Sequence, residues 1–292
     1  MRWLAIINPQ SGRNRNRARL AEVVTRLQPM VDKTVFTRCP GEATEVAMEA
    51  QGYGGVAAVG GDGTLFEILK GINRREQRVA VIPAGRGNSL ARDLGLMRRH
   101  GVFDAIHWEK ARSIDLLEVS VTAADGSESR HLSASTVALG YPATVALGAR
   151  QMAWLGGMSY AAAAAVARPS HFGVRVQYDG GLARDLRLSG FIANNTRHLA
   201  NFLAFHEGNC SDGIFEIMEM SAGRVKQTAH NLSALSGTRA YEPYSPRQAR
   251  SARLQLETPR NLMIDGEILP DVVSLDIRIL PSALECNGPI TR

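Results

Sequence analysis

The sequence contains one run whose residue types suit phosphate binding, Gly60-Gly61-Asp62-Gly63-Thr64. A short apolar segment, Val56–Val59, precedes it, and apolar residues recur after it at helical spacing: Leu65, Ile68, Leu69 and Ile72. The pattern predicts a strand, a tight glycine turn and a helix. Because glycine has no Cβ, such a turn can approach a phosphate closely, and the first amides of a helix favour an anion.

Asp62 adds a second requirement to this loop. A carboxylate repels a phosphate unless a proton or a metal ion lies between them, and Mg2+ commonly bridges the two. The alternative is purely structural, with Asp62 or Thr64 capping the helix that follows. The loop by itself leaves both readings open.

Further motifs carry groups that could act together with this loop. They are Asn8-Pro9-Gln10-Ser11-Gly12, Pro83-Ala84-Gly85-Arg86-Gly87-Asn88, Asp212-Gly213 and Asp265-Gly266-Glu267. Each also has a structural reading: Asn8 can cap a turn, and Asp-Gly is a common hairpin pair. Their chemistry therefore depends on whether the fold brings them together.

The amino-terminal elements predict where three of these motifs lie. Strands are expected at Trp3–Ile7, Thr34–Thr37, the segment before Gly60, and Val79–Ile82, with helices after each. This alternation predicts an α/β domain with a parallel sheet covered on both faces. Ligands bind such sheets beyond the carboxyl ends of the strands, and the glycine-bearing loops lie at that edge.

The carboxy-terminal part has a different pattern of predicted elements, with many short strands. Short, partly alternating strand candidates separated by turn residues predict an antiparallel β-sandwich; they include Ser113–Val121, Leu132–Leu139, Val174–Tyr178, Leu186–Ala193, Ile214–Met220, Ala252–Glu257, Asn261–Ile264 and Val273–Leu280. Helices are expected at Ala143–Ala167 and Val225–Leu235. We therefore expect one domain at residues 1–122 and a second at residues 123–292. The last residues of the second segment could return to the first domain.

The composition indicates an ordinary soluble globular protein. The 292 residues include 45% hydrophobic and 21% charged residues. The net charge of +6 weakly favours phosphate-rich partners or an anionic membrane surface, and no nucleic-acid-binding signature appears. Three separated cysteines suit a reducing cytoplasm. We expect no transmembrane segment, so that any contact with a membrane is peripheral.

Four sequence blocks occur in a fixed order along the chain: Asn8–Gly12; Gly60–Thr64 with Glu67; Pro83–Asn88 with Ala91-Arg92; and Asp265–Glu267. Together they resemble the diacylglycerol kinase catalytic-domain family, which includes bacterial lipid kinases and sphingosine kinases. The resemblance covers nearly the whole chain. It implies an NAD kinase-like nucleotide-binding domain, a β-sandwich domain, and an active site in the cleft between them. It also implies transfer of the γ-phosphate of ATP to a lipid hydroxyl with Mg2+.

The resemblance implies roles for individual residues. Asp62, Asp265 and Glu267 correspond to catalytic carboxylates, with Glu267 as the proton acceptor, Asp265 as its neighbour, and Asp62 acting on metal or substrate. Asp212, with backbone oxygens near Asn209 and Ile214, corresponds to a Mg2+ site. The nucleotide contacts correspond to Asn8, Pro9, Gln10, Ser11, Gly12, Thr37, Gly60, Gly61, Asp62, Gly63, Thr64, Leu65, Phe66 and Arg86.

Two positions depart from the family pattern. The usual Gly-Thr-x-Asn-Asp is Gly85-Arg86-Gly87-Asn88-Ser89 here. Arg86 replaces a hydroxyl with a large cation that could contact a phosphate, and Ser89 replaces a carboxylate that often helps to organise Mg2+.

These observations lead to one principal function and two alternatives. The principal expectation is an ATP-dependent lipid kinase for diacylglycerol or a sphingoid base, acting at a membrane surface. One alternative is a kinase of a soluble substrate such as NAD. The other is a nucleotide- or lipid-binding regulator without catalysis, which the departures from the family pattern at Arg86 and Ser89 suggest. The sequence leaves the oligomeric state open, with a homodimer as one option.

Overall fold

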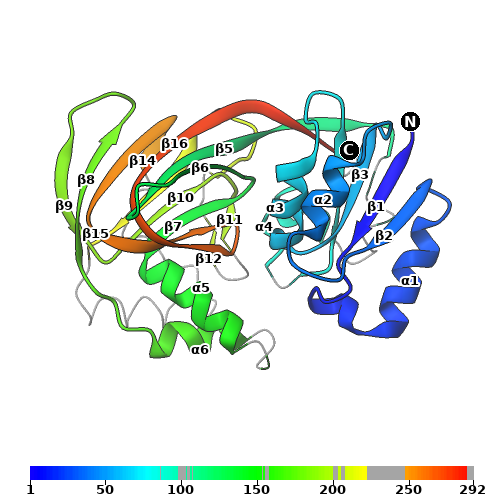
Figure 1. Ribbon diagram of the computed structural model, residues 1–292, viewed down its shortest axis with the longest axis horizontal. Coiled ribbons are helices and arrows are strands. Elements are labelled where there is room, and N and C mark those ends of the chain that lie inside the picture. Colours follow the sequence, from blue (N-terminus) through cyan, green and yellow to red (C-terminus); the bar gives the residue numbers. More distant parts are fainter. Residues whose placement is uncertain are drawn as a thin grey trace. The chain divides into compact units, whose positions relative to one another are not determined.

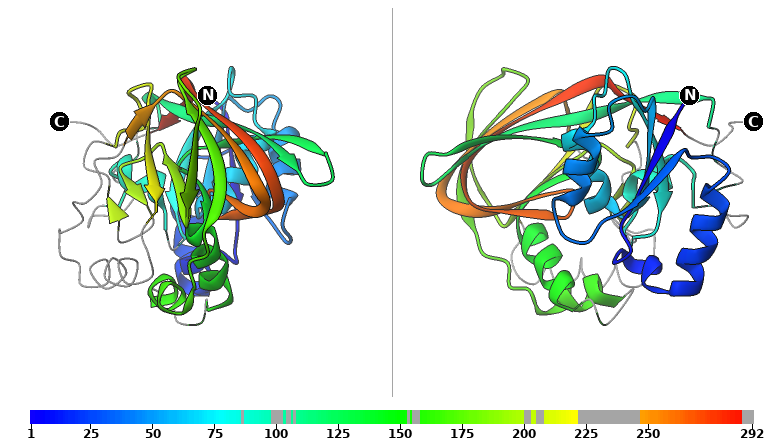
Figure 2. Two further views of the ribbon diagram at one scale, coloured as in Figure 1. Left: turned by 90° about the vertical axis from the view of Figure 1, so that its left-hand side faces the viewer. Right: turned by 45° about the vertical axis from the view of Figure 1, so that its right-hand side comes forward.

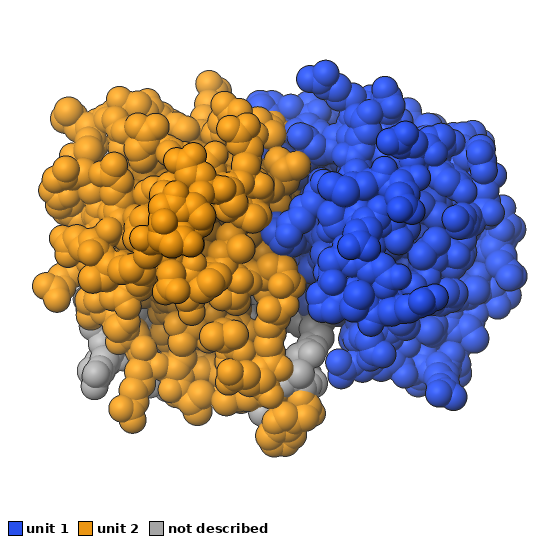
Figure 3. Space-filling view, in the orientation of Figure 1, with its two compact units in different colours: residues 1–116, 281–292 blue, residues 117–280 orange. Residues whose placement is uncertain are grey.

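The chain forms two compact units, which Figure 1 draws as a computed structural model and Figure 3 colours separately. Unit 1 consists of Met1–Leu116 and Pro281–Arg292, and unit 2 of Leu117–Leu280. The structure describes residues 1–85, 87–97, 103, 106, 108–152, 154, 158–199, 203–204, 208–221 and 247–287.

Unit 1 is built on a parallel sheet of β1 (Trp3–Ile7), β2 (Lys33–Phe36), β3 (Gly55–Gly60) and β4 (Arg78–Pro83). Their order is β4-β3-β1-β2, and the end of β16 (Glu267–Asn287) pairs in parallel with β4. Every residue of β1 and β3 is buried. Strands covered on both faces have continuous apolar sequences, and these two have them. The predicted parallel α/β sheet is confirmed.

Helices follow the strands of this sheet. They are η1 (Gly12–Arg15) and α1 (Arg17–Leu27) after β1, α2 (Glu42–Met48) after β2, α3 (Asp62–Gly71) after β3, and α4 (Ser89–Asp93) after β4. The helices α2 and α3 pack side by side (Figures 1 and 2), where Thr44 Oγ1 donates to the carbonyl of Glu67 at 2.9 Å. This contact connects α2 to α3, the helix that begins in the glycine run.

Unit 2 is an antiparallel region, as predicted. Its strands lie in the order β14-β13-β10-β7-β15-β16, while β8 pairs with β15 and β9, and β5 pairs with β16 and β6. A separate short pair is formed by β11 (His198–Leu199) and β12 (Leu203–Ala204). The bounds of the other strands are β5 (Ala111–Ala123), β6 (Glu128–Ser133), β7 (Thr136–Gly140), β8 (Phe172–Tyr178), β9 (Arg184–Leu188), β10 (Gly190–Asn194), β13 (Phe215–Met220), β14 (Arg247–Ala249) and β15 (Ser251–Ile264).

Two helices accompany the sheet of unit 2. The single helix expected over Ala143–Ala167 is instead divided into α5 (Tyr141–Gln151) and α6 (Ser159–Val166). The hydroxyl of Tyr141 donates to the carbonyl of Ala164 at 2.9 Å and connects the two helices. Small residues of α5, namely Ala143, Ala146 and Ala149, are buried with Ala138 of β7 and Ile192 of β10. The buried face of α5 therefore consists of these alanines together with Tyr141 and Val145.

The strand expected at Leu132–Leu139 is also divided, into β6 and β7. The reason is local: the backbone amides of Ala134, Ser135 and Thr136 turn toward the side chain of Asp265 and leave the strand ladder. The helix expected at Val225–Leu235 lies outside the described residues. The expected boundary near residue 123 falls at the end of β5, a strand that begins in unit 1 and ends in unit 2.

Candidate active site

In unit 1, three loops meet at the carboxyl edge of the parallel sheet. The loop after β1 reaches the loop after β3, since the backbone amide of Gly61 donates to Ser11 Oγ at 3.1 Å. The loop after β4 reaches it too, because the amide of Ala84 donates to the carbonyl of Gly60 at 2.7 Å. The fold thus brings together the motifs that begin at Asn8, Gly60 and Pro83.

Glycines allow this close approach of backbones. A Cβ built on Gly12 would lie 2.6 Å from the carbonyl oxygen of Ala84, and one on Gly87 would lie 2.6 Å from Oδ2 of Asp62. Real Cβ atoms do not come this close to other atoms. A larger residue at Gly12 therefore requires a loop to move, and one at Gly87 requires either the loop or the Asp62 side chain to move. The glycine spacing of the sequence therefore serves loop-to-loop packing as well as any ligand.

Asp62 connects two of these loops. Its Oδ2 accepts the amide hydrogen of Asn88 at 2.8 Å, and its Oδ1 accepts that of Ser89 at 2.9 Å. Asp62 therefore caps α4, the helix that begins at Ser89, rather than α3 in which it lies. Burial raises the pKa of the Asp62 carboxyl, whereas the amides of Ser89, Asn88 and Asp62 itself and the Arg92 guanidinium act in the opposite direction.

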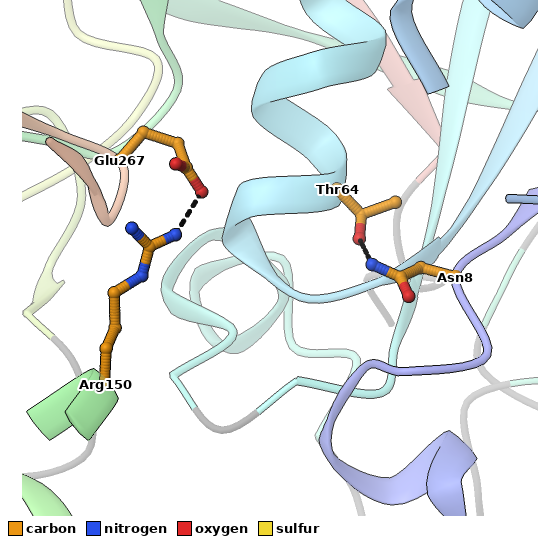
Figure 4. A network of polar contacts seen from close by, with 4 residues as sticks. All are labelled: Asn8, Thr64, Arg150 and Glu267. Atoms are coloured by element: carbon orange, nitrogen blue, oxygen red, sulfur yellow. Dashed lines mark hydrogen bonds and ion pairs between the residues drawn. The ribbon is translucent and has the colours of Figure 1, made fainter. Parts of the chain in front are cut away.

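Asparagine side chains fix the loop after β1 through hydrogen bonds. Asn8 Nδ2 donates to Thr64 Oγ1 at 3.2 Å, as Figure 4 shows, and Asn8 Oδ1 accepts the amide hydrogen of Gln10 at 2.9 Å. Asn14, a buried residue absent from the predicted set, donates from Nδ2 to the carbonyl of Asn8 at 2.9 Å. Its only sequence signal is its place two residues after Gly12.

The other predicted nucleotide contacts differ in what they can offer. The hydroxyl of Thr37 lies 3.4 Å from the carbonyl of Ile7 and is buried, while Leu65 and Phe66 have their side chains in the core. These residues can reach a ligand only through backbone groups. The N-cap of α3 is Gly61, which has no side chain to cap the helix, so the amides at this helix start suit an anion. Arg86 lies outside the described residues.

In unit 2, Asp265 holds a buried turn in place. Its carboxylate accepts hydrogen bonds from Ser133 Oγ at 2.8 Å and from the amides of Ala134, Ser135 and Thr136 at 2.7, 3.1 and 2.8 Å. Asp265 and Gly266 both have positive φ, 48° and 90°, and join β15 to β16. The hairpin reading of Asp-Gly is therefore correct, and the carboxylate additionally fixes the turn to the start of β7.

Glu267 follows this turn and remains accessible. One of its oxygens, Oε1, lies 2.6 Å from Nη2 of Arg150 in the last turn of α5 (Figure 4). Its side chain is 36% exposed. Unlike Asp265, Glu267 can therefore meet a ligand.

The fourth predicted carboxylate, Asp212, lies in an exposed turn. Asp212 Oδ1 accepts the amide hydrogen of Ile214 at 3.2 Å, and the Asn209 side chain accepts that of Ser211 at 3.2 Å. Among the described residues, no group of three or more His, Cys, Asp or Glu side chains could hold a metal ion. A single carboxylate beside backbone carbonyls nevertheless provides the oxygen donors that Mg2+ prefers, with water completing the shell.

Comparison with known proteins places this geometry in context. Residues 2–119 match the sequence model of the diacylglycerol kinase catalytic domain. The chain is 27% identical over 278 residues to the diacylglycerol kinase of Bacillus subtilis, covering 90% of this chain and 88% of that protein. It is 35% identical over 97 residues to the diacylglycerol kinase of Staphylococcus saprophyticus, covering 31% and 32%.

The fold has solved counterparts. The crystal structure of a diacylglycerol kinase from Bacillus anthracis superposes with a TM-score of 0.77 at 20% identity, covering 99% of this chain and 97% of that one. At this identity the likeness concerns the fold alone. It agrees with the parallel and antiparallel regions described above.

Proposed function

We propose that the chain is a lipid kinase of the diacylglycerol kinase catalytic-domain family, because residues 2–119 match that domain and the chain is 27% identical over 278 residues to a diacylglycerol kinase. In this proposal it transfers the γ-phosphate of ATP to the hydroxyl of a lipid of the diacylglycerol or sphingoid-base type. The observation that carries this proposal is the meeting of three glycine loops at the carboxyl edge of the sheet in unit 1. Such an edge is where nucleotides bind in α/β proteins.

In this proposal the loops of unit 1 hold the nucleotide. The backbone around Gly61–Thr64 faces the phosphates, because the first amides of α3 lack partners within the helix. Asn8–Gly12 and Thr37 line the same edge, and Arg86 supplies a cation to a phosphate. Asp62 keeps the Gly61 and Gly85 loops at a fixed separation through its bonds to Asn88 and Ser89.

The proposed metal is Mg2+, which neutralises phosphate charge when it is bound. Asp212 would hold it with the backbone oxygens of Asn209 and Ile214, since this donor set consists only of oxygens. At Ser89, where the family pattern described above has a carboxylate, this chain offers a neutral hydroxyl instead.

The proposed chemistry needs one proton acceptor. The lipid hydroxyl oxygen bonds to the γ-phosphorus, the bond from that phosphorus to the leaving ADP oxygen breaks, and the hydroxyl proton passes to the carboxylate of Glu267. Asp265 takes no proton in this scheme. It fixes the backbone at the position of Glu267, because the four hydrogen bonds to its carboxylate described above hold the turn before that residue.

A lipid substrate implies work at a membrane surface. Among the described residues, no helix combines the length and the apolar character that crossing a bilayer requires. Trp154, Met158 and Val166, near the ends of α5 and α6, expose 82%, 69% and 63% of their surface. Exposed apolar side chains of this size favour a peripheral contact with lipid.

An acceptor panel tests the proposal. The protein is incubated with γ-labelled ATP, Mg2+ and either diacylglycerol or sphingosine in detergent micelles, or with NAD in solution. The proposal predicts a labelled lipid. Labelled NAD with no labelled lipid would instead identify a soluble-substrate kinase, and nucleotide binding without transfer to any acceptor would identify a regulator.

A further inference from the structure

The ion pair between Glu267 and a residue of α5 suggests a role that no motif of the sequence carries. We propose that Arg150 is a positioning residue for phosphoryl transfer, which holds the Glu267 carboxylate in the orientation that accepts the hydroxyl proton. The inference rests on the proposed function and adds a residue to it.

The backbone at Glu267 is already fixed by the turn before it. Ile264 and Glu267 form the pair that closes the β15–β16 hairpin, and the intervening Asp265 and Gly266 have the positive φ angles that a two-residue turn requires. The carboxylate of Asp265 then fixes this turn with four hydrogen bonds. What remains free at Glu267 is therefore only its side chain, a flexible one with three torsions.

Arg150 acts on that remaining freedom. Its Nη2 lies 2.6 Å from Oε1 of Glu267, a charge-assisted contact. Among the described residues, Oε2 of Glu267 accepts no hydrogen bond. Arg150 thus holds one oxygen and leaves the other for the incoming proton.

The helix that carries Arg150 is packed in place. Arg150 lies in the last turn of α5, directly after the buried Ala149, and α5 packs on the sheet through a buried face. A cation is also favourable at the carboxyl end of a helix. The guanidinium is therefore presented by a packed element rather than by a loop.

A competing explanation is an ordinary surface ion pair. The side chains of Arg150 and Glu267 are 51% and 36% exposed, and exposed pairs contribute little to folding stability. Arg175 and Asp185 form a comparable pair in unit 2, with contacts of 2.8 and 3.0 Å on β8 and β9. This second pair is a matched control, because it has no place in the proposed reaction.

The test is a double-mutant cycle on lipid phosphorylation. We compare kcat and KM for the wild type, Arg150→Met, Arg150→Lys, Glu267→Gln, the double variant Arg150→Met with Glu267→Gln, and Arg175→Met. A misplaced reacting group costs about 100-fold in rate, so Arg150→Met should lower kcat by about 10- to 100-fold with KM for ATP and the melting temperature unchanged. Arg150→Lys should restore part of the loss, and Arg175→Met should match the wild type.

The cycle separates the inference from the proposed function. Since Arg150 acts through Glu267, removing it from the Glu267→Gln variant should cause no further loss. Losses that multiply, or an Arg150→Met variant as active as Arg175→Met, would overturn the positioning role and leave lipid kinase activity standing. A wild type that phosphorylates no lipid overturns the proposed function, and the inference with it.

Discussion

The backbone amide of Ser89 donates a 2.9 Å hydrogen bond to Oδ1 of Asp62, 27 residues earlier in the chain. The aspartate at the centre of the glycine run therefore caps the helix of the neighbouring loop. Its other oxygen accepts the amide hydrogen of Asn88. The spacing between two proposed phosphate-binding loops thus depends on one carboxylate. Substitutions in either loop can test this dependence.

Asp62→Asn should loosen the loops and reduce turnover. An asparagine offers one oxygen to two amides, so one amide faces an NH2 group and loses its partner. An unsatisfied donor costs about 1–3 kcal/mol, and relief from burying a charge opposes this cost. We therefore expect a loss near 1 kcal/mol in the free energy of unfolding and a clear fall in kcat, measured by urea denaturation and by the labelled-ATP assay.

The control for this variant is Glu76→Gln, an exposed carboxylate of unit 1. Surface substitutions change stability by less than about 0.5 kcal/mol, and Glu76 has no proposed part in the reaction. An Asp62→Asn protein with wild-type kcat would show that the loop spacing does not matter for transfer.

Gly87→Ala should disturb the same contact from the other side. The new Cβ would lie 2.6 Å from Oδ2 of Asp62, so either the loop or the aspartate must move. We expect weaker ATP binding, measured as a higher Kd by calorimetry. Gly52→Ala is the control: its φ of 88° strains an alanine, but open space surrounds its Cβ, so it should lose stability and keep the affinity for ATP. Equal affinities in both variants would contradict the proposed nucleotide site.

How much of this the sequence predicts depends on the range of the interaction. The apolar runs of β1 and β3 are continuous because both faces are buried, and this pattern is visible along the chain. The partners of Asp265 are 129 to 132 residues away, and no local pattern specifies them. Arg150 is 117 residues from Glu267 on a helix without a motif, so only the folded chain identifies it.

Asp265→Asn should be the most destabilising of the conservative changes in unit 2. Its carboxylate is buried and accepts from three backbone amides and one hydroxyl, which an asparagine cannot all satisfy. Breaking such a buried network costs more than the roughly 1 kcal/mol of one hydrogen bond. Ser133→Ala, which removes only the hydroxyl, should cost about 1 kcal/mol. Urea unfolding that ranks the two variants equally would contradict this account of the turn.

Tyr178 gives unit 2 a pH dependence at the alkaline end. Its hydroxyl donates to Glu219 Oε1 at 2.7 Å, and burial together with this carboxylate raises the pKa of Tyr178. A raised pKa in the folded state means that the stabilisation is complete below the unfolded value of about 10 and is lost as the pH rises above it. The stability difference between the wild type and Tyr178→Phe should therefore shrink above pH 10 in urea titrations, and a constant difference from pH 8 to 11 would contradict it.

The transfer of labelled phosphate from ATP to diacylglycerol in detergent micelles, by the wild type and by Glu267→Gln, tests the central claim most directly. Asp185→Asn, an exposed carboxylate of unit 2, serves as the control. Losing a general base lowers rates by about 100- to 10,000-fold, so we predict that loss in kcat for Glu267→Gln and wild-type turnover for Asp185→Asn. Equal transfer by Glu267→Gln and the wild type would contradict the claim that Glu267 takes the lipid proton.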